Sequence, residues 1–150
     1  MITDAEAMQS ALAEARLAAD AGEVPIGAVM VHEGVIIARG QNRVLRDNDP
    51  TAHAEIVALR AAAVALGNYR LNGCALYVTL EPCAMCAGAM IHARLDRLVF
   101  AAVDPKTGAC GSVLSVLNHP QLNHQMQVEQ GILADEAAEL LRSFFRERRG

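Results

Sequence analysis

The sequence predicts a three-layer α/β/α fold, in which a mixed sheet of about five strands is covered by helices on both faces. Helical and strand patterns alternate along the chain, as they do in α/β proteins. The length of 150 residues suits one compact domain that buries a core without disulfides. Hydrophobic residues make up 53% of the chain and aromatic residues only 3%, so the core should be aliphatic. We therefore expect residues 1–150 to form a single domain.

The first third of the chain predicts a helix followed by a β-hairpin. Thr3 and Glu6 form a capping-box pattern, and apolar residues then recur at helical spacing, so a helix is expected to run to about Asp20. Segments 26–31 and 35–38 consist of strand-forming residues. A Glu-Gly pair between them suits a tight turn, so the two segments should pair as a hairpin.

The middle of the chain predicts a helix, a strand, a second helix and a second strand. Residues 49–51 are typical of a helix start, and one apolar face then continues to a stop near Gly67. A buried strand is expected over 75–80, Pro82 opens the next helix, and another strand is expected over 98–103. A strand, helix and strand in this order imply a right-handed parallel unit.

The last third predicts a long loop and a final helix. Residues 104–125 are rich in Gly, Asn, His and Pro, and we interpret them as a surface loop of the kind that often carries binding residues. The final helix has one apolar face at helical spacing. The members of that face are Leu133, Ala137, Leu140, Leu141 and Phe144.

Charge and cysteine content narrow the functional classes. No apolar stretch reaches the roughly 18 residues that cross a bilayer, and the N-terminus lacks the order of a signal peptide, so a cytoplasmic protein is expected. In that reducing compartment, four cysteines, two of them in a Cys-x-x-Cys pair, favour metal ligation or redox chemistry over disulfides. The net charge of -4 argues against a broad, sequence-independent grip on nucleic acid.

Three residues have the spacing of a zinc site. Cys83 and Cys86 lie at a helix start just beyond a strand, where the helix dipole stabilises thiolates and where open α/β sheets place ligands. His53, at another helix entry, would be the third ligand. Three protein donors are the number that catalytic zinc uses when water takes the fourth position. The sequence therefore predicts an open, catalytic zinc site.

Glu55 is the predicted proton carrier of this site. Two thiolates and a neutral imidazole cancel the charge of zinc, so the metal alone acidifies water less than it does in a tri-histidine site. A neighbouring base is then required, and Glu55 could take the proton from water, deliver it to the ring and protonate departing ammonia.

Other interpretations of these motifs stay open from the residues alone. A Cys-x-x-Cys pair also occurs in thiol oxidoreductases and in structural zinc modules that bind a partner. A structural site would need a fourth ligand, for which Cys74, Cys110 and His92 are the candidates. We favour packing roles for the two cysteines and an ordinary helix position for the histidine.

Several longer stretches carry a family resemblance. They are EVPIGAV, DPTAHAEIVALR, LYVTLEPCAMCAGAMIHARL, DPKTGACGS, LNHPQLNH and GILADEAAELLRSFFRERR. With these, nearly the whole chain resembles the bacterial tRNA-specific adenosine deaminases of the TadA type, within the cytidine deaminase fold. The resemblance implies one zinc ion per chain, held by His53, Cys83 and Cys86, with Glu55 as proton shuttle. It also implies hydrolysis of adenosine to inosine at the wobble position of a tRNA anticodon.

The resemblance further assigns substrate contacts and partners. Asn42 matches a residue that hydrogen-bonds the target base, and the backbone at Ala54 lies in the same pocket. Asp104, Lys106 and Thr107 match a loop that contacts the flanking nucleotides. The implied partners are the tRNA anticodon stem-loop and a second copy of the chain in a homodimer; neither a membrane nor DNA is expected. A deaminase of free guanine, cytosine or a nucleoside is the alternative within the same fold.

The final helix offers an independent indication of RNA binding. Phe145 falls about 120° from the apolar stripe, with Arg142, Arg148 and Arg149 three or four positions away on its own face. An exposed aromatic ring among arginines is a stacking platform for bases. The equally weighted alternative is that Phe145 packs on a neighbour and the arginines are a solvated helix end. Residues that could extend the patch are Arg43, Arg46 and Lys106.

Overall fold

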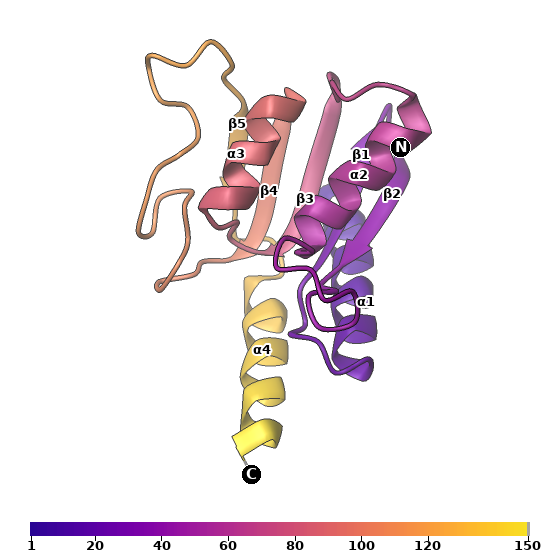
Figure 1. Cartoon of the computed structure of the whole chain (residues 1–150), viewed down its shortest axis with the longest axis vertical. Helices are drawn as coiled ribbons and strands as arrows, with labels where there is room; N and C mark the ends of the chain where they lie inside the picture. The colour runs from indigo at the N-terminus through magenta and orange to yellow at the C-terminus, as the bar shows by residue number, and fades with distance from the viewer. Residues whose placement is uncertain (150) are drawn as a thin grey trace.

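The computed structural model describes residues 1–149 and contains four helices and five strands (Figure 1). Each helix or strand lies close to a segment that the sequence predicts, apart from the last strand. In chain order the elements are α1 (Asp4–Asp20), β1 (Gly27–His32), β2 (Val35–Gln41), α2 (Ala54–Leu66), β3 (Cys74–Leu80), α3 (Ala84–Ala93), β4 (Arg97–Ala102), β5 (Gln127–Gln130) and α4 (Ala134–Arg149). Within the described residues, no helix is long and apolar enough to cross a membrane.

The strands form one mixed sheet in the order β2-β1-β3-β4-β5. β1 pairs antiparallel with both β2 and β3, whereas β3 and β4, and β4 and β5, pair in parallel. The hairpin and the parallel unit built around α3 are therefore neighbours in the same sheet. This arrangement confirms the predicted mixed sheet of five strands.

Helices cover both faces of the sheet, which confirms the three predicted layers (Figure 1). The alternation of side chains along β1 shows how one strand serves two cores. Ala28 and Met30 belong to the core beneath α2 and α3, whereas Val29 and Val31 belong to the core beneath α1 and α4. Because β1 is buried on both faces, its sequence is a continuous apolar run rather than an alternating one.

The starts of two helices differ from the prediction, and one strand was not predicted. The second helix begins only at Ala54, because the Asp49 carboxylate accepts bonds from the Thr51 amide and hydroxyl and closes a turn instead. The last helix begins at Ala134, since Leu133 has a positive φ of 58° and lies just before it. β5 was missed because its four residues are mostly exposed and carry no apolar run. Residues 103–126 form the long loop that the sequence predicts.

Two glycines let helices touch the sheet closely. A Cβ at Gly27 would overlap the α1 backbone at Ala11 and Ala15, and a Cβ at Gly40 would overlap the α2 backbone at Ala54. At both positions a larger residue would push a helix away from its strand. The contact at Gly40 therefore sets the depth at which the first turn of α2 lies on β2.

One polar cluster ties the N-terminal helix to three strands. Arg97 of β4 makes paired hydrogen bonds to Asp4 of α1 and to Glu129 of β5, and its guanidinium also donates to the Tyr77 hydroxyl of β3. The Arg97 and Tyr77 hydrogen bonds lower the pKa of Asp4 to about 2. This cluster lies on the α1 and α4 side of the sheet.

Candidate metal and catalytic site

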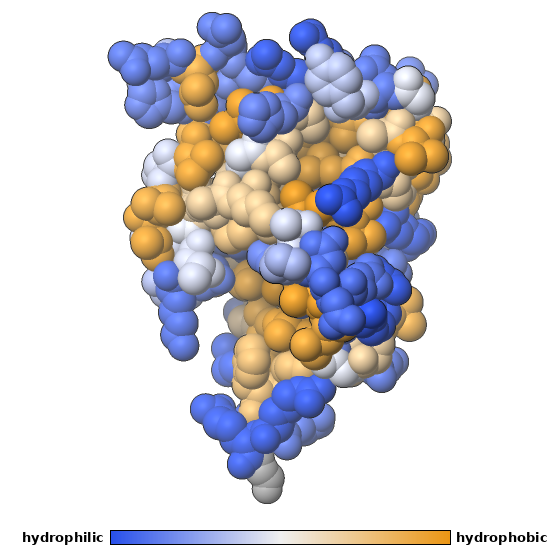
Figure 2. All heavy atoms as spheres, viewed as in Figure 1, coloured by the Kyte–Doolittle hydropathy of each residue, from blue (hydrophilic) through white to orange (hydrophobic). Residues whose placement is uncertain are grey.

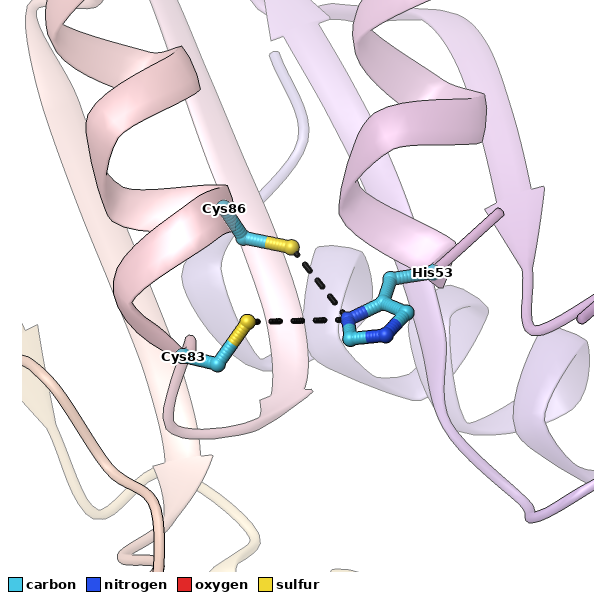
Figure 3. A group of neighbouring side chains, drawn as sticks. All are labelled: His53, Cys83 and Cys86. Carbon is cyan, nitrogen blue, oxygen red and sulfur yellow. Dashed lines mark hydrogen bonds between the residues drawn. The ribbon is translucent and has the colours of Figure 1, made fainter. Parts of the chain in front are cut away.

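The predicted metal ligands lie at the first positions of two neighbouring helices. His53 is the N-cap residue of α2 and Cys83 is the N-cap residue of α3, with Cys86 in the first turn of α3. N-cap side chains normally accept a bond from the first helical amides, but neither of these does. Their side chains instead point toward one another (Figure 3). The two helix starts thus supply ligands rather than caps.

The distances within this group fit a zinc ion. Nδ1 of His53 lies 3.6 Å from Sγ of Cys83 and 3.5 Å from Sγ of Cys86, and all three atoms lie within 4.8 Å of one another. Zn–S bonds of about 2.3 Å and a Zn–N bond of about 2.0 Å in a tetrahedron place sulfur and nitrogen about 3.5 Å apart. The donor set and its spacing therefore match tetrahedral zinc with one position open.

The side chains of this group shift one another's pKa values. Hydrogen bonds from Cys86 and His53 lower the pKa of Cys83 to about 3, and the same bond to Cys83 raises the pKa of Cys86. The Cys83 partner also raises the pKa of His53. A thiolate is thus already favoured at Cys83, and a metal cation would favour a second one at Cys86.

Glu55 lies beside the metal group without being part of it. Its side chain is only 4% exposed, and burial raises its pKa to about 7. A carboxyl group with a pKa near neutrality both accepts and releases protons readily. Glu55 lies in the first turn of α2, two residues after His53, where its carboxyl group is close enough to His53 and Cys86 for both to influence its pKa.

No fourth ligand joins the cluster within residues 1–149. Cys74 is fully buried on β3 with its sulfur 3.7 Å from Nδ1 of His32, and Cys110 lies in the long loop. His92 lines an apolar groove between α2 and α3. The packing roles predicted for Cys74 and Cys110 and the helix position predicted for His92 agree with the structure. Among residues 1–149, a structural zinc site closed by one of these three side chains does not agree with it.

Comparisons with known proteins place the chain in a family. The MafB19-like deaminase pattern matches residues 2–149. The chain is 52% identical over 142 residues to the tRNA-specific adenosine deaminase of Agrobacterium fabrum, covering 95% of this chain and 93% of that one. A solved structure from studies of A-to-I editing by tRNA:A34 deaminases matches with a TM-score of 0.87 at 50% identity, covering 90% of this chain and 98% of that one. The chain belongs to the tRNA-specific adenosine deaminases.

Related solved structures also include a deaminase of a free base. The guanine deaminase of Nitrosomonas europaea matches with a TM-score of 0.81 at 29% identity, covering 96% of this chain and 85% of that one. Membership of the family establishes a zinc-dependent hydrolytic deaminase, whose His-Cys-Cys group is able to bind one metal ion. An oxidoreductase that uses its Cys-x-x-Cys pair for redox chemistry does not agree with these relatives.

One residue that the resemblance assigned to the substrate and one that the pattern of the final helix assigned to RNA line the same pocket of the deaminase. Asn42, which is 9% exposed, directly follows β2, and Phe145, which is 46% exposed, lies on α4. They meet at a largely apolar pocket of ≈ 370 Å³, whose wall also includes Val44, Leu45 and Phe144. The residues of the metal group and Glu55 are not among those that line this pocket, and the side-chain oxygen of Asn42 accepts a bond from the Val44 amide.

The loop residues assigned to the flanking nucleotides form a compact turn. The Asp104 carboxylate accepts bonds from the backbone amides of Lys106 and Thr107 and from the Thr107 hydroxyl. Burial raises the pKa of Asp104, but these bonds and the Lys106 charge outweigh it and lower the pKa. The turn has a defined shape, and the side chain of Lys106 is exposed at its tip.

The arginines around Phe145 are more occupied than the sequence suggested. Arg148 stacks over the ring of Phe144, with its Cζ 4.3 Å from the ring centroid, and donates to the Gly22 carbonyl. Arg142 pairs with Glu139, and Phe145 packs edge-on against Phe144. Two of the three arginines on the Phe145 face therefore bind neighbouring groups of the deaminase, and the role of this face in RNA binding stays a prediction.

Two of the basic residues that could extend this patch are bound to acidic side chains. Arg43 pairs with Asp47, and Arg46 binds the Glu23 carboxylate. Glu23 is only 1% exposed, and it also accepts bonds from the backbone amides of Leu45 and Arg46. Arg43 and Arg46 thus fix the turn after Asn42 instead of adding free charge. Sequence reasoning missed Glu23 because a single acidic residue after a helix carries no pattern of its own.

Proposed function

We propose that this deaminase converts adenosine to inosine at the wobble position of a tRNA anticodon. The observation that carries the proposal is the open His-Cys-Cys group with a buried Glu55 beside it, in a chain 52% identical to a tRNA-specific adenosine deaminase. The reaction consumes one water molecule per adenosine and releases inosine and ammonia. Bases of the anticodon loop are unpaired, so turning one into a pocket costs little.

The site residues divide this chemistry between them. His53, Cys83 and Cys86 would hold a zinc ion, which would supply the Lewis acid that activates water for attack on C6 of the purine. Glu55 accepts the proton that water gives up and delivers it to N1 of the ring. The carboxylate then takes the second proton of the former water from the hydroxyl on C6 and passes it to the amino group as the C–N bond breaks, which leaves the C6 carbonyl of inosine and ammonia. A pKa of about 7 suits Glu55 to both directions of transfer.

Recognition falls to the residues around the pocket and the loop. Asn42 hydrogen-bonds the target base, and the backbone at Ala54 lies in the same pocket. Asp104, Lys106 and Thr107 contact the nucleotides that flank it. The shared pocket of Asn42 and Phe145 supports a stacking role for Phe145. The final binding residues are Phe145 and Arg149, both exposed on α4.

We also propose that the chain acts as a cytoplasmic homodimer made of one domain per copy. Apolar side chains gather over the face that carries α2 and α3 (Figure 2). A groove of ≈ 390 Å³ with mostly apolar walls runs between these helices, and Tyr69 at its edge is 68% exposed. An exposed apolar face of this kind is typical of a protein interface. Analytical ultracentrifugation of the zinc-loaded chain tests the dimer, and a monomer at micromolar concentration would contradict it.

A substrate comparison tests the proposed reaction. The zinc-loaded protein is incubated separately with an anticodon stem-loop that carries adenosine at the wobble position, with the same loop carrying guanosine there, and with free guanine, cytosine and adenosine. Mass detection should show inosine only in the first RNA. Turnover of free guanine with no reaction on RNA would instead assign the chain the activity of its N. europaea structural relative.

A further inference from the structure

Glu81 is a buried carboxylate with no part in the metal group or the proton transfers. It follows the last residue of β3 and lies two positions before Cys83. Its exposure is 3%, which is costly for an acidic group unless its oxygens are bonded. Its partners therefore show what the group is for.

Both carboxylate oxygens of Glu81 are filled by one loop. Oε1 accepts from the Asp104 backbone amide at 3.0 Å and from the Ser112 hydroxyl. Oε2 accepts from the Cys110 amide at 3.0 Å and from the Ser112 amide at 3.1 Å. These donors come from the two ends of the segment 104–112, so a single side chain closes it into a ring.

The residues proposed to contact RNA lie within this ring. The Asp104 amide is bound by Glu81, and the Asp104 carboxylate in turn binds Lys106 and Thr107. Inside the ring, Gly108 lies so close that a Cβ there would overlap the Glu81 carboxylate and the Asp104 carbonyl. The shape of the turn therefore depends on Glu81 and on the absence of a side chain at 108.

We infer that Glu81 is a positioning residue that holds loop 104–112 in the form in which Asp104, Lys106 and Thr107 meet the RNA. This inference rests on the proposed function, because the loop contacts nucleotides only if RNA is the substrate. Glu81 touches neither zinc nor the reacting base, so its effect reaches the reaction through the loop. Losing it should weaken substrate binding far more than the chemical step.

The substitution Glu81→Gln tests the positioning role, because it should release only the Asp104 end of the loop. If the new side-chain nitrogen faces the Cys110 and Ser112 amides, its N–H groups meet two other hydrogen-bond donors, which is unfavourable. If it turns the other way it can donate to the Ser112 hydroxyl, and only the Asp104 amide loses its acceptor. The favoured orientation thus releases Asp104 while keeping the bulk of the side chain, so no cavity forms.

The experiment measures kcat and KM on the stem-loop for the zinc-loaded wild type, Glu81→Gln and Glu129→Gln. The last variant neutralises a carboxylate paired with Arg97 on the sheet edge and serves as the control. For Glu81→Gln we expect KM to rise by about tenfold, kcat to change by less than about threefold, and zinc to remain at one per chain. Loss of zinc, a fall confined to kcat, or values equal to those of the control would overturn the inference.

Two further measurements keep the test decisive. Amide hydrogen exchange should speed up in residues 104–112 of Glu81→Gln and not in the control. Unchanged protection there would refute the positioning role whether or not RNA is the substrate.

Gly108→Ala should reproduce the rise in KM with Glu81 intact. An unchanged KM would contradict the inference even if Glu81→Gln did not fold. A wild type inactive on the stem-loop is a failure of the proposed function, and hydrogen exchange still reports on the loop.

Discussion

The helix starts on the two sides of the sheet use their first residues differently. α1 begins with a complete capping box, in which the Thr3 hydroxyl accepts from the Glu6 amide and the Glu6 carboxylate accepts from the Thr3 amide. α2 and α3 begin with His53 and Cys83, whose side chains cap nothing. A lost cap costs about 1 kcal/mol of stability. The start of α1 is therefore stabilised by its own side chains, whereas the starts of α2 and α3 give up that local stability and place their first side chains at the metal group.

The largest expected effect comes from removing a ligand at one of these uncapped helix starts. Cys83→Ser should lose both zinc and activity, because a hydroxyl is a poor substitute for a thiolate at a site of this charge. Elemental analysis and the inosine assay measure the two losses. Cys110→Ser is the control and should keep one zinc per chain. A fully metallated Cys83→Ser protein would show that the assigned ligand is wrong.

The second largest effect distinguishes loss of the catalytic base from loss of the metal. Glu55→Ala should keep zinc and fold but lower kcat by about 10²- to 10⁴-fold, since it removes the proton carrier and no ligand. Zinc content, thermal unfolding and single-turnover rates are compared with those of wild type. Glu55→Gln keeps the shape of the side chain and should be equally slow. Near-normal turnover in either variant would refute the proton shuttle.

A core substitution on the opposite side sharpens the comparison. Met8 of α1 is fully buried beneath that helix, so Met8→Ala should lower the free energy of unfolding by about 2 to 5 kcal/mol. Zinc content and kcat/KM at a temperature where the variant is folded should stay within about twofold of wild type. Leu17→Ala removes a side chain that is 51% exposed on the same helix and should cost far less. A lost metal in Met8→Ala would show that the two sides are not independent.

The fourth prediction concerns the RNA-facing end of α4. Phe145→Ala should weaken binding of the stem-loop by about 1 to 3 kcal/mol and leave zinc untouched, because it removes one stacking surface. Fluorescence anisotropy with a labelled stem-loop measures the change. Leu17→Ala, which removes an exposed apolar side chain elsewhere, should bind normally. If Phe145→Ala binds as tightly as wild type, the ring serves packing against Phe144 instead.

The smallest effect is a pH dependence on the α1 side. The pKa of Asp4 is lowered to about 2 in the folded chain, below the value of about 3.9 in an unfolded one. Its contribution is therefore complete above about pH 4 and is lost as the pH falls through about 2. Asp4→Asn should cost about 1 kcal/mol at neutral pH, a figure reduced for its partial exposure, and the gap should close near pH 2.

Urea unfolding of wild type and Asp4→Asn across this pH range measures the gap. Asp20→Asn, at the exposed far end of the same helix, is the control and should show a constant difference from wild type. A gap for Asp4→Asn that does not shrink in acid would mean that the Arg97 pair contributes nothing to stability.

Sequence reasoning reached most of the fold because the patterns involved are local. The capping box, the Glu-Gly turn and the apolar runs each depend on residues close together in the chain, and they gave α1, the hairpin, β3 and β4. The exposed β5 has no such pattern and was missed. The start of α2 was misplaced because Asp49 satisfies its hydrogen bonds within a turn, which competes with helix capping.

The site was predictable only where ligand chemistry restricts the residue types. His53, Cys83 and Cys86 could be proposed together because few functions need that set, and the structure brings them within bonding range of one ion. The roles of Asn42 and of the 104–107 turn stay predictions. Glu23 and Glu81 could not be found, since a carboxylate that binds backbone amides has no preferred spacing from them. The bond from Arg148 to the Gly22 carbonyl could not be foreseen, because these residues become neighbours only in the folded chain, whereas its stacking on Phe144 is a local contact within α4.

The contact between Gly40 and the first turn of α2 has a consequence for how this chain tolerates change. The Ala54 carbonyl occupies the space that any side chain at 40 would need, and Ala54 separates His53 from Glu55. A methyl group added there would have to displace the ligand and the base together. In a saturation library scored for inosine formation, position 40 should return glycine alone, far more strictly than its distance in the sequence from the reacting groups implies.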